Sequence, residues 1–384
     1  MKIALFTNAY LPYLSGITLS VSTQKEELEA LGHKVIVVAP AYPGHKEIDP
    51  NIIRVMSIPA PYPGYRFVNP FSPFAFLRLK REKIDIIHVH QPFGVGLGAR
   101  LTAKLLGVPL VYTFHTLFSR YVHNASWIPR KFSQFIVVQY LKFFCNLADT
   151  IITPSTMVMR LLRMRKIKTP IKVLPTGMRM WEFKKQMEIG TQRVEIRKKH
   201  NIPLDAKLLM CSTRISAEKN IPFLLKAFPV IKKQAPNTYF IVVGGGPKVE
   251  DYKKEAAKID PQIIFTDRQT HAQVIDHCLA ADLFVYASKT ETQGLVLNEA
   301  KACGLAVVAV RGGGISDVID NGVDGYLVPE NQEIFIEHVM RLLSDDQLRQ
   351  KMGQKGKEDT IARFSSEVVA KQMETIYNQL IAKQ

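Results

Sequence analysis

The stretch Thr290-Glu291-Thr292-Gln293-Gly294-Leu295-Val296-Leu297-Asn298-Glu299-Ala300 follows an apolar run, Leu283–Ala287, that is typical of a buried strand. Its two glutamates are eight residues apart, a little over two helical turns. A loop can therefore present Glu291 while the following helix presents Glu299 on the ligand-facing side. The first amides of that helix, which favour anions, belong to Gly294, Leu295 and Val296. The stretch predicts a strand, a loop and a helix with a ligand at the carboxyl end of the strand.

The same alternation of strand and helix runs through the whole chain. In the second half the other predicted strands are Lys207–Ser212, Thr238–Val243, Gln262–Phe265 and Ala306–Val310. In the first half we expect strands near 2–7, 34–39, 84–89, 109–114 and 150–153, with helices at Ser20–Leu31 and Val95–Leu106. Strands that alternate with helical patterns predict parallel sheets covered by helices.

One segment interrupts the alternation near the middle of the chain. Pro175-Thr176-Gly177-Met178 is followed by a charged, weakly periodic stretch, 182–200. A chain of 384 residues also favours two separate cores. We therefore expect an N-terminal domain of residues 1–180 and a C-terminal domain of residues 181–365. A last helix, about Ser366 to Ile381, is expected to return within 366–384 and complete the first domain.

Composition and charge limit the function classes. The chain is 47% hydrophobic and 22% charged, and no apolar stretch approaches the roughly 20 residues that span a bilayer. The first residues are interpreted as a strand instead of a signal peptide, and the four scattered cysteines as reduced thiols of a cytoplasmic protein. Residues 1–190 hold 25 Lys/Arg against 10 Asp/Glu, a net +15, whereas the remainder is +2. An anionic partner, either nucleic acid or a membrane surface, is expected at the N-terminal half.

Two glycine runs and a pair of cations point to a phosphate-bearing ligand in the second half. Gly244-Gly245-Gly246-Pro247 and Arg311-Gly312-Gly313-Gly314 each follow a predicted strand, where glycine permits close backbone approach. Arg214 and Lys219 follow the strand Lys207–Ser212, and a diphosphate needs such paired cations.

With these motifs in order, the chain resembles the retaining GT-B glycosyltransferases of family 4. The likeness rests on Ser15-Gly16, Thr113-Phe114-His115-Thr116, Pro175-Thr176-Gly177, Arg214 with Lys219, Gly244-Gly245-Gly246-Pro247 and the paired glutamates. It implies an α/β fold of two Rossmann-like parallel-sheet domains that face each other across a cleft. The N-terminal domain would bind the acceptor and the C-terminal domain the nucleotide sugar.

The resemblance also implies a role for each site residue. Arg214 and Lys219 would stabilise the leaving diphosphate, Glu299 would bind the ribose hydroxyls, and Glu291 would lie near the donor sugar. The backbone at Gly16, Gly244 and Gly294 to Val296 would approach the donor. His115 would face the reacting centre, although a buried, hydrogen-bonded histidine at a strand end is the alternative.

No metal or other cofactor is expected. His88 and His90 alternate on a predicted strand but lack a third ligand, and the sequence has no Asp-x-Asp motif. The cationic pair would replace a metal at the diphosphate. Ser316-Asp317 and Thr266-Asp267-Arg268 depart from the family's usual residues, which leaves the nucleotide open.

The acceptor is suggested by aromatic residues mixed with cations in 61–83 and 117–144. The residues expected at the membrane are Trp127, Arg130, Lys131 and Lys142. The chain resembles the diacylglycerol glucosyltransferases of bacterial membranes, which implies a hexosyltransferase that uses UDP-glucose and a lipid acceptor on the inner face of the cell membrane. Alternatives are a soluble or phospholipid-linked sugar acceptor, as in family 4 mannosyltransferases, a sugar-nucleotide epimerase, and a nucleic-acid-binding protein, although no nucleic acid is expected. In the simplest alternative, most of these aromatics are core.

Overall fold

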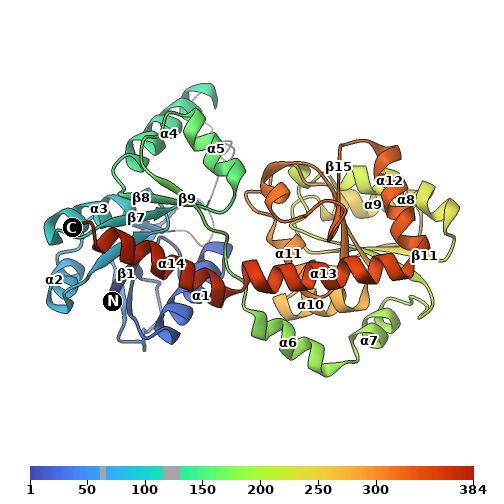
Figure 1. Cartoon of the computed structure of the whole chain (residues 1–384), viewed down its shortest axis with the longest axis horizontal. Helices are drawn as coiled ribbons and strands as arrows, with labels where there is room; N and C mark the ends of the chain where they lie inside the picture. The colour runs from blue at the N-terminus through green and yellow to red at the C-terminus, as the bar shows by residue number, and fades with distance from the viewer. Residues whose placement is uncertain (61–65, 116–129) are drawn as a thin grey trace. The chain divides into compact units, whose positions relative to one another are not determined.

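The computed structural model describes residues 1–60, 66–115 and 130–384, and it forms two compact units (Figure 1). Unit 1 consists of Met1–Met178 together with Ser366–Gln384, and unit 2 is Arg179–Ser365. The chain therefore leaves unit 1 after Met178 and returns to it at Ser366. At this return the backbone N–H of Ser366 donates to the carbonyl oxygen of Met178 at 3.0 Å or less, namely 2.8 Å.

Unit 1 is built on a seven-stranded parallel sheet in the order β3-β2-β1-β6-β7-β8-β9. Its strands are β1 (Lys2–Phe6), β2 (Lys34–Pro40), β3 (Ile52–Val55), β6 (Ile86–Val89), β7 (Leu110–Thr113), β8 (Thr150–Thr153) and β9 (Ile171–Val173). A separate antiparallel pair is formed by β4 (Ser57–Pro59) and β5 (Arg66–Val68). The strand order reverses between β1 and β6, and ligands of open parallel sheets bind at such a reversal.

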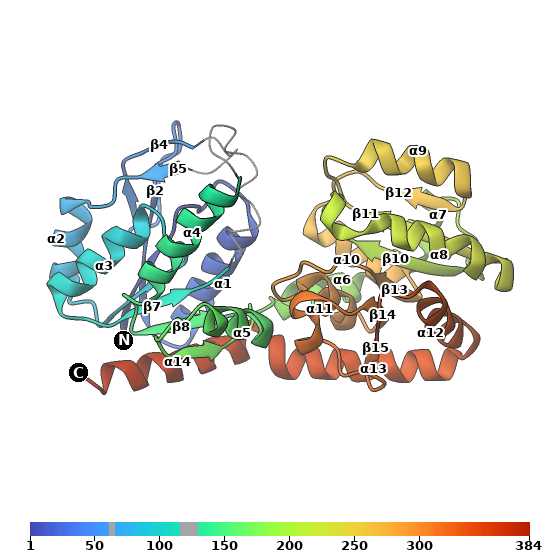
Figure 2. The same cartoon turned by 90° about the horizontal axis from the view of Figure 1, so that it is seen from above.

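Helices cover both faces of the unit 1 sheet. One face carries α1 (Gly16–Ala30) and the C-terminal α14 (Ser366–Ile381), which lie side by side (Figure 1). The other face carries α2 (Pro73–Glu82), α3 (Val95–Leu106), α4 (Arg130–Cys145) and α5 (Thr156–Met164) (Figure 2). The last helix of the chain is thus part of the core around the first strand, because Tyr377 and Met373 are buried with residues of β1 and α1.

Unit 2 repeats this plan with a six-stranded parallel sheet in the order β12-β11-β10-β13-β14-β15. Its strands are β10 (Lys207–Ser212), β11 (Thr238–Val243), β12 (Ile263–Phe265), β13 (Leu283–Tyr286), β14 (Ala306–Val310) and β15 (Gly325–Val328). Its helices are α6 (Met180–Ile189), α7 (Gln192–Lys199), α8 (Ile221–Gln234), α9 (Val249–Ile259), α10 (His271–Ala280), α11 (Leu295–Ala302), α12 (Gln332–Ser344) and α13 (Asp346–Phe364). The order reverses between β10 and β13, the strands that precede the predicted cations and glutamates.

The charged stretch 182–200 is not an interruption, because it forms α6 and α7 and both helices pack on α10. Arg197 explains how so charged a segment is held. Its side chain is fully buried, pairs with Asp282 at 2.7 Å and donates to the carbonyl oxygen of Ala206 at 2.7 Å. A buried guanidinium is tolerated when its N–H groups are satisfied in this way.

Two further features differ from the sequence-based expectation. Helix α1 begins at Gly16 instead of Ser20, because the Ser15 side chain accepts a hydrogen bond from the Thr18 N–H and caps the helix. Three short edge or near-edge strands, β3, β9 and β15, were not predicted. Within the part of the chain that the structure describes, no helix has the length and apolarity needed to cross a membrane.

Candidate active site

Arg214 and Glu291 follow neighbouring strands of unit 2, at the point where the strand order reverses. Arg214 is exposed on the loop after β10, and the short 3-10 helix Ala217–Lys219 on the same loop ends at Lys219. The Lys219 ammonium forms an ion pair with the Glu291 carboxylate, and each side chain is only 17% exposed. The Tyr286 hydroxyl donates to the same carboxylate at 2.5 Å. Burial raises the pKa of Tyr286 well above its usual value, so the phenol remains a donor.

The two glycine runs hold these two loops in place. A Cβ atom at Gly246 would overlap the carbonyl oxygen of Ile215, beside Arg214, and one at Gly313 would overlap the carbonyl oxygen of Glu291. Gly313 also has a φ of +57°, a conformation that glycine adopts at little cost. The glycine runs therefore let their loops pack against the backbones that carry Arg214 and Glu291. This is a structural reason for the runs that the sequence alone did not reveal.

Helix α11 begins after Gly294, whose φ is +93°, and carries Glu299 in its second turn. The amides of Leu295 and Val296 lie in the first turn, where a helix has no internal acceptor for its N–H groups. The Glu299 side chain is 20% exposed and lies 3.4 Å from Nε2 of His271, which forms an ion pair with it. The predicted donor residues of unit 2 thus follow β10, β11 and β13 on one sheet.

In unit 1, His115 lies just after β7 and belongs to a row of three stacked imidazoles. Nδ1 of His90 and Nε2 of His115 are 2.9 Å apart, and the two rings stack with centroids separated by 5.2 Å. His90 also stacks on His88, with centroids 4.5 Å apart. Burial lowers the pKa of His88 to about 3 and that of His115 to about 4, and it lowers the pKa of His90 well below its usual value. All three imidazoles are therefore neutral at physiological pH.

The hydrogen bonds of His88 fix its tautomer. Its Nδ1 atom lies 2.6 Å from the hydroxyl of Tyr377 on α14 and 3.0 Å from the amide nitrogen of Gln24 on α1. Because the Gln24 amide nitrogen can only donate, Nδ1 is the acceptor and Nε2 carries the proton. Nε2 then donates to the Thr113 hydroxyl at 2.6 Å. His115 thus lies at the end of a buried polar row that starts at the C-terminal helix.

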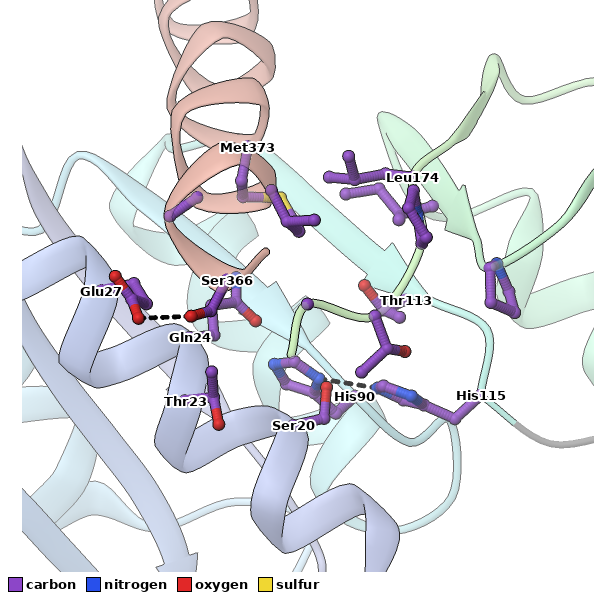
Figure 3. Close-up of a pocket in the computed structure, with 17 residues that line it drawn as sticks. Ser20, Thr23, Gln24, Glu27, His90, Thr113, His115, Leu174, Ser366 and Met373 are labelled. Atoms are coloured by element: carbon purple, nitrogen blue, oxygen red, sulfur yellow. Dashed lines mark hydrogen bonds between the residues drawn. The ribbon is translucent and has the colours of Figure 1, made fainter. Parts of the chain in front are cut away.

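A small cavity of about 50 Å³ lies against this row (Figure 3). His90, Thr113 and His115 line one side of it, and residues of α1, of the segment 174–177 and of α14 line the others. On the α1 side the Ser366 hydroxyl donates to Glu27 at 2.5 Å. His90 Nε2 has no hydrogen-bond partner among the described residues. Gly16 is not part of this lining, and a Cβ atom there would meet nothing within 4 Å.

Two family models match the chain. Residues 14–180 match the model described as Glycosyltransferase Family 4, and residues 192–359 match that described as Glycosyl transferases group 1. An alpha-monoglucosyldiacylglycerol synthase of Acholeplasma laidlawii is 31% identical over 100% of this chain and 98% of its own length. The chain belongs to glycosyltransferase family 4. It is a glycosyltransferase enzyme with the GT-B fold, as its sequence motifs predicted.

Other relatives of this glycosyltransferase are consistent with that family and fold. An alpha-monoglucosyldiacylglycerol synthase of Streptococcus pneumoniae is 33% identical over 85% of this chain and 75% of its own length. A solved structure of Anabaena HepE in complex with UDP-glucose matches 99% of this chain and 100% of its own with a TM-score of 0.71, at 16% identity.

The membrane residues predicted for the transferase are only partly described. Trp127 lies in 116–129, outside the described residues, as do the side chains of Arg130 and Lys131. Lys142 is half-buried on α4. The same helix exposes a row of large apolar side chains with helical spacing: Phe132, Phe135, Ile136 and Phe143. The expectation that the aromatics lie outside the core therefore holds for these positions, whereas Phe144 is fully buried.

Sequence reasoning missed several residues of the transferase that contact the predicted site. Tyr286 bonds to Glu291, His271 pairs with Glu299, and Tyr377 bonds to His88. The alternation of His88 and His90 was noticed but considered only as a metal site. The residues that the structure describes include no group of three or more His, Cys, Asp or Glu that could hold a metal ion.

Proposed function

We propose that this glycosyltransferase moves a glucosyl group from UDP-glucose to diacylglycerol at an anionic membrane surface, with retention of configuration and without a metal ion. Both curated relatives described above are named for an alpha-glucosylated diacylglycerol product. That name supports the sugar and the acceptor. The residues of the two units support the chemistry.

The donor would be bound through unit 2. Arg214 is exposed and Lys219 is held beside Glu291, so both can approach a diphosphate. Positive charge at the leaving diphosphate stabilises the charge that develops as the bond to the sugar breaks, and this is the work a metal ion otherwise performs. Glu299 would accept hydrogen bonds from the ribose hydroxyls, and the amides at Gly294, Leu295 and Val296 would contact phosphate.

His115 would contact the reacting centre as a neutral imidazole. In the transfer, the bond between the sugar C1 and the diphosphate oxygen breaks and a bond from C1 to the acceptor oxygen forms. The acceptor hydroxyl loses its proton, and UDP leaves. A neutral His115 can donate or accept a hydrogen bond without adding charge next to a cationic sugar carbon, whereas an imidazolium would repel it.

The observation that carries the lipid acceptor is the exposed apolar row of α4. Phe132, Phe135, Ile136 and Phe143 are each 47–58% exposed, and Lys142 lies on the same helix. Phe74 and Leu77 of α2 are also exposed, beside the basic Arg78, Lys80 and Arg81. Exposed aromatic residues beside cations suit the boundary of an anionic membrane, where the rings enter the acyl layer and the cations meet headgroups.

A donor and acceptor screen tests this proposal. UDP-glucose, UDP-galactose, UDP-N-acetylglucosamine and GDP-mannose are each incubated with the enzyme and with phosphatidylglycerol vesicles that contain or lack diacylglycerol. Nucleotide diphosphate release is followed, and the lipid product is examined by NMR. We expect release only with UDP-glucose and diacylglycerol, and an α-linked glucosyl lipid.

Other outcomes would contradict particular parts of the proposal. A β-linked product would contradict retention, and rapid transfer from GDP-mannose to a phospholipid-linked sugar would favour a mannosyltransferase. Turnover of UDP-glucose to another UDP-hexose without any acceptor would indicate an epimerase. Because the row on α4 carries the lipid argument, Phe135→Ser with Phe143→Ser should reduce transfer to diacylglycerol in vesicles. Val230→Ser, at an exposed apolar position on α8 of unit 2, is the matched control.

A further inference from the structure

His271 is the first residue of α10, and its position is closely fixed. The preceding Thr270 caps the helix in a reciprocal capping box with Gln273. The buried Phe183 ring of α6 packs edge-on against the imidazole, with centroids 5.7 Å apart. Neither contact involves the predicted donor residues. They show that the histidine is set in place by the fold of unit 2.

Both nitrogens of this imidazole have a carboxylate neighbour. Nδ1 donates to Glu182 of α6 at 2.5 Å, and Nε2 lies 3.4 Å from an oxygen of Glu299 on α11. A carboxylate oxygen accepts, so both nitrogens must carry hydrogen and the ring is an imidazolium. The hydrogen bond to Glu182 raises the pKa of His271 to about 10, and the contact with Glu299 acts in the same direction.

The two contacts differ in length, and the difference indicates their roles. The short one, to Glu182, anchors the imidazolium on α6. The long one leaves Glu299 able to keep its charge partner while it accepts hydrogen bonds from a ligand. Among the residues that the structure describes, His271 is the only ion-pair partner of Glu299. Without it, a carboxylate that is four-fifths shielded from water would lose its compensating charge and its preferred direction.

We propose that His271, anchored by Glu182, is a positioning residue that orients the Glu299 carboxylate for the ribose hydroxyls of the donor. This inference rests on the proposed function, which assigns the ribose to Glu299. It adds two residues that contact no part of the ligand themselves. Their effect is therefore confined to ligands that have ribose hydroxyls.

The test compares UDP with 2′,3′-dideoxy-UDP by calorimetry, because the dideoxy nucleotide cannot donate hydrogen bonds to Glu299. The wild type should bind UDP about 10- to 100-fold more tightly than the dideoxy compound, the range expected for hydrogen bonds to a carboxylate. Glu299→Gln and His271→Gln should each reduce this ratio toward one by weakening UDP binding, with little change for the dideoxy compound. Glu182→Ala should reduce the ratio less, because it acts only through His271.

Each result supports or overturns a separate claim. If the wild type does not discriminate, or if Glu299→Gln retains the full ratio, the ribose assignment fails and the inference fails with it. If Glu299→Gln loses discrimination but His271→Gln retains it, only the positioning role is wrong. A purely structural histidine would instead weaken both nucleotides equally and leave the ratio unchanged. Glu188→Gln, which removes an exposed carboxylate from the same helix as Glu182, is the matched control.

Discussion

The two units use opposite electrostatics at their predicted site residues. In unit 2 these residues are charged: Lys219 pairs with Glu291, His271 pairs with Glu299, and Arg214 is exposed. In unit 1 they are uncharged: His88, His90 and His115 form a buried row of neutral imidazoles. Yet residues 1–190 carry a net +15, whereas residues 191–384 carry only +2.

This difference shows that the net charge of a domain does not locate its ionic chemistry. The excess cations of unit 1 are spread over its helices, whereas its site residues have been removed from water and left neutral. Unit 2 is almost balanced overall because its cations have carboxylate partners. We infer that unit 2 binds the anionic part of the donor, that neutral groups of unit 1 serve the sugar, and that its surface cations serve a different, extended anion.

The largest effect is expected from the ionic residues. Lys219→Ala should lower kcat/KM by about 10³-fold, because it removes positive charge at the leaving diphosphate and also the partner of Glu291. Initial rates at subsaturating donor measure the effect. Lys226→Ala, at an exposed position on α8, is the matched control and should leave the rate unchanged. A loss of less than fivefold for Lys219→Ala would contradict the charged half of the comparison.

The next effect concerns the neutral half. His115→Ala should lower kcat by about 10²-fold, which is typical for the loss of a polar group at a reacting centre. Because burial lowers the pKa of His115 to about 4, the wild-type kcat should not show an ionisation of this group between pH 5 and 9. A pH profile of kcat measures this. A step near pH 6.5 that disappears in His115→Ala would mean that the imidazole is protonated in use.

The surface cations should matter for membranes and not for nucleotides. Replacing Arg130, Lys131 and Lys142 with glutamine should weaken binding to anionic vesicles by about 1 kcal/mol per cation at low salt, and less as salt screens the attraction. Cosedimentation with phosphatidylglycerol and phosphatidylcholine vesicles measures this, and UDP affinity of the variant serves as the control. Equal binding of both proteins to both vesicle types would remove electrostatics from the docking model.

A smaller effect is expected on stability at low pH. The folded pKa of His88 is about 3, whereas an imidazole in the unfolded chain has a pKa near 6.5. Between these values the unfolded chain binds a proton that the folded chain does not, so the stabilisation is complete above pH 6.5 and is lost as the pH falls. Thermal midpoints measured from pH 7 to pH 4.5 should therefore fall more steeply for the wild type than for His88→Asn. Parallel curves would show that His88 does not titrate differently in the two states.

The smallest effect is expected from chelation. If Arg214 and Lys219 supply the charge at the diphosphate, EDTA should leave kcat unchanged. Turnover that is lost in EDTA and restored by Mg²⁺ would show that the cationic residues of unit 2 are not sufficient.

The sequence predicted the parts of the molecule that depend on local spacing. The strand, loop and helix around Glu291 and Glu299 were predicted because eight residues fix where two side chains lie on one segment. The contacts that hold these residues were not predicted, because they join distant parts of the chain. His271 and Glu182 are 89 residues apart, and His88 and Tyr377 are 289 apart.

Burial of charge also escaped prediction. The stretch 182–200 resembles a solvated segment as long as Arg197 is assumed to face water. Its burial depends on Asp282, which no local pattern connects to it. Short strands such as β9 and β15 were missed for a related reason, because three or four residues carry too little periodicity and depend on a neighbouring strand for their hydrogen bonds.

The position of α14 in unit 1 affects the order in which the protein can fold during synthesis. A ribosome makes α14 last, after all of unit 2, and this helix supplies the buried Tyr377 to the core around β1 and α1. Unit 2 is continuous in sequence and can fold as soon as it emerges. Unit 1 starts first and finishes last. Until translation ends, the apolar face of α1 has no cover and His88 lacks its tyrosine partner, so the nascent N-terminal half must be protected from aggregation while unit 2 is being made.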